Sequence, residues 1–191
     1  MQGDPKFPLL RWFPQIPDPQ TMNTLIHKIA VCALVASAGA GHAQSAKRAA
    51  YSLPDKYREG IIKIAGEASG RDPEEWAFVC RANHSSEGIV EINVKNGKIS
   101  RQQASPGWRV PLGSNAPIAL ERVLVDSRGA HEIARRYVAD KGLQLGSTKL
   151  TLEQADPTSD PVWSVWCFNG EGSYIGLMKL LAPTGDVIFF E

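Results

Sequence analysis

Two short segments of the chain repeat the pattern Trp-x-x-x-Cys. Residues 76–80 read WAFVC and residues 163–167 read WSVWC, in a chain that has only five tryptophans and three cysteines. An Asp-Pro pair precedes each tryptophan, and a turn glycine follows each at nearly the same distance, Gly97 in the first case and Gly185 in the second. Such a spaced repetition is typical of a chain built from two copies of one supersecondary unit. We therefore predict a duplicated fold.

Both pentapeptides are predicted to be β-strands, because the side chains within them alternate between two faces. Other segments share this strand character and are bounded by turn residues. The predicted strands are 75–82, 89–95, 98–103, 147–154, 162–168 and 174–182. Asn96-Gly97 predicts a hairpin turn, because both residues tolerate positive φ. The strands of each half are therefore expected to form an antiparallel meander.

A helix is predicted before each set of strands. Residues 52–69 begin with a capping serine and a proline, and they carry apolar side chains at three- and four-residue spacing. Asp126-Ser127 caps a second helix, which Gly142 ends. The predicted fold class is α+β, with two tandem helix-plus-antiparallel-sheet units.

The first 43 residues are not expected to belong to the fold. Residues 22–43 contain a lysine, a short apolar run and small residues at the end, which is the pattern of a signal peptide cleaved between Ala43 and Gln44. The apolar run is shorter than the ~20 residues of a membrane-spanning helix. The proline-rich residues 1–21 are expected to be disordered, or to precede the true start of translation. The chain is therefore predicted to be periplasmic or secreted, without stable membrane insertion after cleavage.

The remaining chain divides into four predicted segments: a linker over 44–51, a first unit over 52–103, a Pro/Gly-rich loop and connection over 104–125, and a second unit over 126–191. Acidic and basic residues balance in this part of the chain. Nucleic acid is not expected as a partner, because it would require a concentrated basic face.

The second unit resembles the PepSY domain family. The family pattern runs through a capped helix, a Pro-x-Trp-x-Val strand and a Thr-Gly hairpin. The matching residues are Asp126, Ser127, Ala130, Ile133, Ala134, Pro161, Trp163, Val165, Thr184, Gly185, Val187 and Ile188. The resemblance is clearest over 126–191, and a diverged first copy is expected over 52–103. It implies an exported, non-catalytic module with a helix packed across an antiparallel sheet, which inhibits or regulates a protease or another envelope protein.

Cys80 and Cys167 are the two cysteines that remain once the signal peptide is removed. An even number of cysteines in an exported domain predicts a disulfide. Two small buried apolar residues are the alternative, and the sequence leaves both open. The two residues do not form the Cys-x-x-Cys motif of a redox pair.

Neither a catalytic nor a metal-binding motif is predicted, and no cofactor is expected. His84 and His131 have no ligand partners at metal-binding spacing and are interpreted as surface imidazoles. Trp108 and Arg109 in the 104–118 loop are candidate binding residues, because Trp and Arg are frequent at binding hot spots.

Trp166 is a third candidate binding residue. Strand alternation places it on the face opposite Trp163, where it can be exposed on the sheet. Trp76 and Trp163 are expected in the core, because large aromatic side chains on the covered face of a strand are usually buried.

The favoured functional hypothesis is a periplasmic module that binds a protein or peptide partner, with inhibition or regulation as the result. One alternative is a small secreted enzyme that uses the thiols of Cys80 and Cys167, which accessible thiols of low pKa would favour. The other is a structural protein of the envelope, which a stable higher oligomer would favour.

Overall fold

A computed structural model of the chain describes residues 44–69, 72–81, 88–104 and 116–191. In this part of the chain, eight strands form one antiparallel sheet with the order β4-β3-β2-β1-β5-β6-β7-β8. The strands are β1 (Ile61–Ala68), β2 (Glu75–Arg81), β3 (Ile89–Lys95), β4 (Lys98–Ala104), β5 (Ser147–Glu153), β6 (Val162–Phe168), β7 (Tyr174–Leu181) and β8 (Val187–Phe190). The helices are α2 (Ala46–Tyr51), α3 (Asp55–Arg58), η1 (Leu120–Arg122) and α4 (Ser127–Asp140). The α+β class is thus confirmed. No helix within these ranges is long and apolar enough to cross a membrane.

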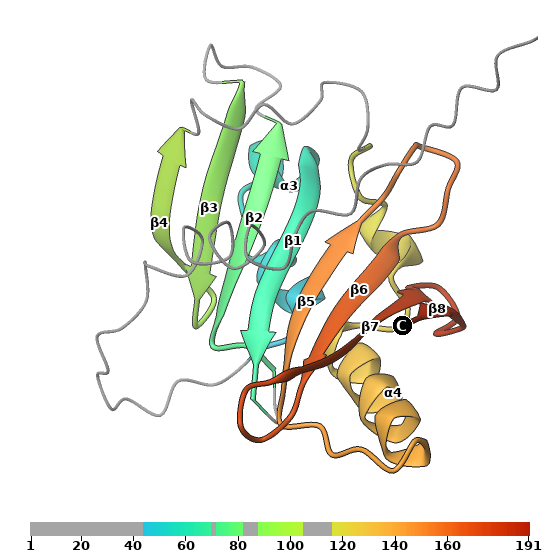
Figure 1. Cartoon of the computed structure of the whole chain (residues 1–191). Helices are drawn as coiled ribbons and strands as arrows, with labels where there is room; N and C mark the ends of the chain where they lie inside the picture. The colour runs from blue at the N-terminus through green and yellow to red at the C-terminus, as the bar shows by residue number, and fades with distance from the viewer. Residues whose placement is uncertain (1–43, 70–71, 82–87, 105–115) are drawn as a thin grey trace, which may run out of the picture. The chain divides into compact units, whose positions relative to one another are not determined.

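Two consecutive four-stranded meanders meet in the middle of the sheet (Figure 1). One consists of β1 to β4 and the other of β5 to β8. They join through antiparallel pairing of β1 with β5, in which Ala65 lies opposite Thr151. Each strand of one meander therefore has a counterpart at the same distance from the β1–β5 pair.

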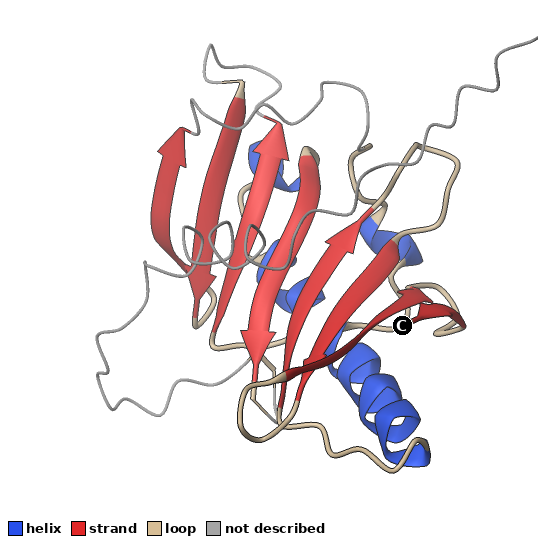
Figure 2. Cartoon of the chain, in the orientation of Figure 1, coloured by secondary structure: helices blue, strands red, loops and turns tan. Residues whose placement is uncertain are grey.

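The helices cover one face of the sheet. Helices α2 and α3 contact β2, and α4 contacts β6; Figure 2 shows the two short helices behind the strands of the first half. Successive side chains along each strand point alternately to this covered face and to the opposite face. Trp76, Phe78, Trp163, Val165 and Met178 are all fully buried there. The prediction that Trp76 and Trp163 lie in the core is confirmed.

The two buried tryptophans make the same kind of hydrogen bond. The indole nitrogen of Trp76 donates to the carbonyl oxygen of Gln44 at 2.8 Å. The indole nitrogen of Trp163 donates to the carbonyl oxygen of Val125, also at 2.8 Å. Gln44 directly precedes Ser45, the N-cap of α2, and Val125 directly precedes the N-cap of α4. Each tryptophan therefore fixes the chain at the point where the helix of its own half begins.

The two halves also share an irregularity of register. The pairing of β3 with β4 shifts between Asn93 and Val94. The pairing of β7 with β8 shifts between Lys179 and Leu180. A bulge increases the local twist of a strand pair, so both ends of the sheet are bent at corresponding places.

The N-termini of α2 and α4 are joined through a buried aspartate. The side chain of Asp72 is only 1% exposed. Its carboxylate accepts hydrogen bonds from the Ser127 hydroxyl at 3.0 Å and from the Arg128 guanidinium at 2.9 Å. The Ser127 oxygen in turn accepts the backbone N–H of Ala46 at 3.1 Å. This network ties the loop before β2 to the first turns of both helices.

The predicted helix over 52–69 is wrong. Its second half is strand β1, preceded by the single turn α3. Residues Ile61, Ile64 and Ala68 fit helical spacing, but they also line the covered face of a strand whose backbone passes close to Trp76. A Cβ at Gly66 would lie 2.7 Å from the Trp76 ring. The β-branched isoleucines favour the extended conformation, and pairing with β2 and β5 decides the outcome.

The prediction of a linker over 44–51 is also wrong. Helix α2 occupies most of it, and the three alanines that face the sheet, Ala46, Ala49 and Ala50, are buried. Small side chains allow such a short helix to pack closely on the strands beneath it. The other predicted strands and the helix that begins at Ser127 are confirmed.

Candidate functional site

The face of the sheet opposite the helices carries a group of aromatic, aliphatic and lysine side chains over β5 to β8. Paired residues on neighbouring strands share a face, and the pairs Lys149–Trp166, Trp166–Leu177, Phe168–Tyr174 and Lys179–Phe189 place this group on one side. We call it the aromatic face; it consists of Lys149, Trp166, Phe168, Tyr174, Leu177, Lys179 and Phe189. No element among the described residues covers it.

Trp166 lies at the centre of the aromatic face. It is partly exposed, between Lys149 of β5 and Leu177 of β7. The prediction that Trp166 lies on the face opposite Trp163 is confirmed. A partly exposed indole on a strand offers a large contact area at small entropic cost, because its neighbours already restrict it.

The aromatic rings on this face lie close to lysine ammonium groups. Lys149 Nζ is 5.5 Å from the centroid of Phe168, and Lys179 Nζ is 6.0 Å from that of Phe189. Phe168 also meets Tyr174 edge to face, with centroids 6.0 Å apart. These cation–π contacts hold the ammonium groups against the rings.

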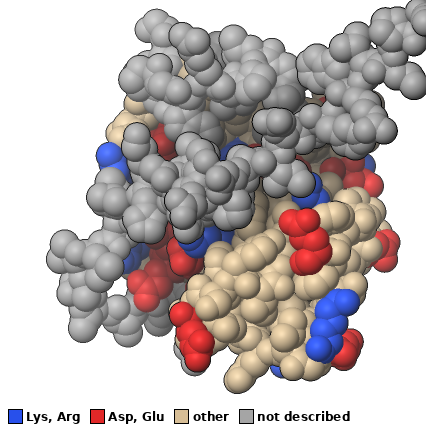
Figure 3. All heavy atoms as spheres, viewed as in Figure 1, with Lys and Arg blue, Asp and Glu red and all other residues tan. Residues whose placement is uncertain are grey.

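The aromatic face contains two lysines and no carboxylate of its own, and Glu191 lies at its border beside Tyr174. Its two lysines form no ion pair with any described residue, although Glu67 of β1 lies directly opposite Lys149. The neighbouring Glu153 is occupied by Lys63 at 3.0 Å. In Figure 3, the surface in the region of β6 and β7 is mostly uncharged. The chemistry that fits such a surface is an apolar partner segment that also carries carboxylates.

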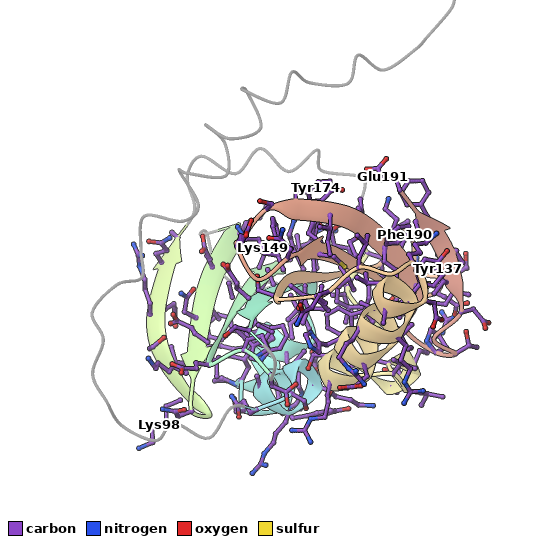
Figure 4. The ribbon with its side chains drawn as sticks, turned by 60° about the horizontal axis from the view of Figure 1, so that its bottom comes forward. Lys98, Tyr137, Lys149, Tyr174, Phe190 and Glu191 are labelled. Atoms are coloured by element: carbon purple, nitrogen blue, oxygen red, sulfur yellow. The ribbon has the colours of Figure 1, made fainter. Side chains whose placement is uncertain are left out.

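The edge of the sheet beyond β7 adds exposed apolar groups. Ile188 and Phe189 of β8 are 54% and 42% exposed. On the covered side of the same strand, Phe190 packs on Tyr137 of α4 with centroids 4.9 Å apart; the two residues are labelled in Figure 4. Strand β8 is thus held in place from the helix side while Ile188 and Phe189 remain exposed.

The other predicted binding residues lie elsewhere. Trp108 and Arg109 fall outside the described residues, as does Ala43 of the predicted cleavage site. Gln44 is buried at the start of the fold. Trp166 is therefore the one candidate binding residue of the sequence analysis that the described structure places on a surface.

Cys80 of β2 and Cys167 of β6 are free, buried thiols that lie level with opposite ends of β1. Cys80 pairs with Ile61, at one end of β1. Cys167 pairs with Thr148, which pairs with Ala68 at the other end of β1. Across the sheet alone they are three strand spacings apart, about 14 Å, whereas disulfide-bonded cysteines have Cα atoms within about 7 Å. The predicted disulfide within one chain is wrong, and the alternative of two buried apolar residues describes them.

Burial also determines the reactivity of the two thiols. It raises the pKa of Cys80 to about 12 and that of Cys167 to about 11. The thiolate is the nucleophilic form, so a raised pKa lowers reactivity at neutral pH. Both sulfurs also lie beneath the helices and not on the aromatic face.

The interpretation of His131 as a surface imidazole is wrong. His131 is only 8% exposed, and its Nδ1 lies 3.1 Å from the Thr148 hydroxyl of β5. It occupies the side of α4 that packs on the sheet, where a histidine can fill space if a polar neighbour is present. The described residues contain no group of three or more His, Cys, Asp or Glu side chains arranged to hold a metal ion. His84 falls outside the described residues.

The stability of the fold is expected to fall as the pH drops below about 6.5. Burial lowers the pKa of His131 below its usual 6.5, an effect that Arg135 reinforces and that Glu132 and Asp72 oppose. The unfolded chain therefore binds a proton at a higher pH than the folded chain does. His131 contributes its full stabilisation above pH 6.5 and loses it as the pH falls from there towards the lowered pKa.

The comparison that isolates this effect is His131→Asn, which removes the titrating group. Free energies of unfolding from urea titrations at pH 7.5 and pH 5.5 should fall more for the wild type than for the variant. Equal losses in the two proteins would show that His131 does not titrate differently on folding.

No family model and no curated protein sequence matches this chain. It is similar to the crystal structure of a "putative lipoprotein" from Clostridium difficile 630, at 12% identity and a TM-score of 0.42, with 72% of this chain and 85% of that chain covered. A likeness at this TM-score assigns neither a family nor a function.

Proposed function

We propose that this chain is an exported, non-catalytic protein that binds an acidic, apolar segment of another envelope protein through its aromatic face. The observation that carries the proposal is the set of partly exposed rings around Trp166, accompanied by two lysines without a described ionic partner. Aromatic residues in a surface patch are frequent at the energetic centres of interfaces. Charge complementarity with the lysines favours a partner that carries carboxylates.

We further propose that the fold consists of two tandem PepSY-like units. Three observations support the duplication: the two meanders meet at the β1–β5 pair, the two register shifts lie at corresponding places, and each WxxxC tryptophan binds the carbonyl that precedes a helix. The hydrogen bond from each indole to the carbonyl that precedes a helix accounts for the repetition of the tryptophan. Each unit needs an indole N–H at that position to anchor its helix.

The alternative of a thiol enzyme receives less support. The thiols of Cys80 and Cys167 are buried, lie level with opposite ends of β1 and have raised pKa values. Inhibition or regulation of a protease remains the form of binding that the PepSY resemblance implies. The proposed location is the periplasm or the exterior of the cell, which the signal-peptide pattern supports.

Binding can be tested with two synthetic peptides that differ only in charge. The first alternates Leu and Phe with Glu, and the second has Lys in place of each Glu. Titration calorimetry on the purified protein should show binding of the Glu peptide. The Trp166→Ala variant should bind it about tenfold to a hundredfold more weakly, the range expected for removal of a hot-spot side chain. The double variant K149E/K179E should show a similar loss, because repulsion replaces attraction.

The matched control is Lys98→Glu. Lys98 is exposed at the start of β4 and lies far from Lys149, as Figure 4 shows. This variant changes the net charge by the same amount per site and should leave the affinity within about twofold, because screened charges at that separation interact weakly. Equal affinity for the two peptides, or unchanged affinity in Trp166→Ala, would reject the aromatic face as the binding surface.

A further inference from the structure

Gln44 has an unusual environment for the first residue of a mature chain. It is only 9% exposed, and its backbone carbonyl accepts the Trp76 indole N–H at 2.8 Å. Its side chain reaches the β3–β4 turn, where a Cβ built on Gly97 would be 3.6 Å from Oε1. The residue is thus fixed at its carbonyl, and its side chain lies beside the β3–β4 turn without a hydrogen bond to a described residue that would hold it there.

The side-chain amide nitrogen of Gln44 is not satisfied. Nε2 is buried and has no hydrogen-bond partner among the described residues. Buried amide groups are nearly always paired, because an unpaired donor loses its hydrogen bonds to water without replacement. An orphaned NH2 group therefore needs an explanation.

Cleavage after Ala43 would add a second unfavourable group at the same place. The inference rests on the proposed export, in which this cleavage frees the backbone nitrogen of Gln44 as an α-ammonium group. An unpaired positive charge is costly in a buried position. The buried side chains that follow Gln44 in the chain are the apolar Ala46, Ala49 and Ala50; the Asp126 carboxylate near this point is already occupied by the backbone N–H groups of Lys47 and Ser127.

We propose that Gln44 is a modification site, at which the mature chain is closed to an amino-terminal pyroglutamate. The neutral α-amine attacks Cδ of its own side-chain amide and forms the N–Cδ bond of a five-membered lactam. The Cδ–Nε2 bond breaks, Nε2 leaves as ammonia, and the proton lost by the amine accompanies it. The reaction is neither an oxidation nor a reduction and needs no co-reactant.

Cyclisation resolves both problems at once. The orphaned Nε2 leaves the molecule, and the α-ammonium becomes a neutral lactam N–H. The carbonyl carbon and oxygen of Gln44 take no part in the reaction, so the hydrogen bond from Trp76 is retained. The product is a neutral amino terminus that suits its buried site.

The test is the mass of the full chain after expression with residues 1–43 and recovery from the exported fraction. Intact mass and fragmentation of the amino-terminal peptide should show a chain that begins at position 44 and is lighter by one ammonia than residues 44–191. Gln44→Asn provides the control, because its side chain is one methylene too short to form the five-membered ring. That variant should keep its full mass, and fragmentation should locate an amine-specific label on the α-amine of residue 44 in addition to the labels on lysines.

The possible outcomes separate this inference from the proposed export. A chain that begins at Gln44 with a free, labelled amine would overturn the pyroglutamate but support export. A chain that retains residues 1–43 would overturn both. A chain cleaved at another position would overturn the pyroglutamate and the predicted cleavage site but not export. Loss of ammonia from the wild type but not from Gln44→Asn is the result that supports the proposal.

Discussion

Replacing Trp163 by Phe is expected to lower the free energy of unfolding by about 2–5 kcal/mol. The substitution leaves the Val125 carbonyl without the indole N–H that it binds at 2.8 Å, at a cost of ~1–3 kcal/mol for an unsatisfied buried group. It also leaves a void where part of the fully buried ring was, which adds ~1–2 kcal/mol. Chemical denaturation monitored by circular dichroism measures the change.

Two further variants make this experiment decisive. Trp76→Phe removes the equivalent bond to Gln44 and should cost nearly the same, since both tryptophans fix the start of a helix. Trp166→Phe, on the other face of the same strand, should lower the free energy of unfolding by less than about 1 kcal/mol, because substitutions of partly exposed side chains usually have small effects. If the loss at Trp163 were no larger than at Trp166, the indole anchors would not be a principal source of stability.

Replacing Asp72 by Ala is expected to lower the free energy of unfolding by about 2–3 kcal/mol. The change leaves the buried Ser127 hydroxyl without its acceptor, and it disconnects the loop before β2 from both helices. Loss of a hydrogen bond to a charged group costs ~1.5–3 kcal/mol. The ion pair with Arg128 adds little, because the arginine side chain is 78% exposed.

Asp160→Ala is the matched control for Asp72→Ala. Asp160 holds the same place in the second Asp-Pro pair, but its side chain is 38% exposed and binds Arg122 at the surface. Its removal should cost less than about 1 kcal/mol. Similar losses at the two positions, measured by the same denaturation, would mean that burial of Asp72 does not set the size of its contribution.

Much of the fold could be predicted because the second half follows its local signals. A strong N-cap at Asp126, a helical stripe and regular strand alternation all agree with the final structure. The same alternation placed Trp163 in the core and Trp166 on the other face. Local preference and tertiary packing point the same way in these segments.

The first half was harder to predict because its signals conflict. The spacing of Ile61 and Ile64 fits a helix as well as a strand, and only pairing with β2 and β5 distinguishes the two. The strand β1, which pairs with β5 at the centre of the sheet, therefore has the spacing of a helix in the sequence. The helix of the first half is the short α2, whose alanine-rich sequence resembles a linker.

The candidate site could be predicted only in part. Trp166 followed from alternation alone, but the lysines and phenylalanines around it come together through register between strands that are separate in sequence. The burial of His131 and the separation of Cys80 from Cys167 have the same origin. Their positions depend on the order of the strands in the sheet. Local sequence patterns do not predict that order.

The pairing of β1 with β5 satisfies the backbone hydrogen-bonding groups that would otherwise be exposed at the edge of each meander. A chain cut between β4 and η1 would produce two fragments, each ending in a row of unpaired N–H and C=O groups. Such fragments would be poorly soluble alone but complementary when mixed. In two intact copies, β1 of one chain could likewise pair with β5 of the other. The formation of the β1–β5 pair therefore completes folding within one chain and is also a route to a domain-swapped dimer.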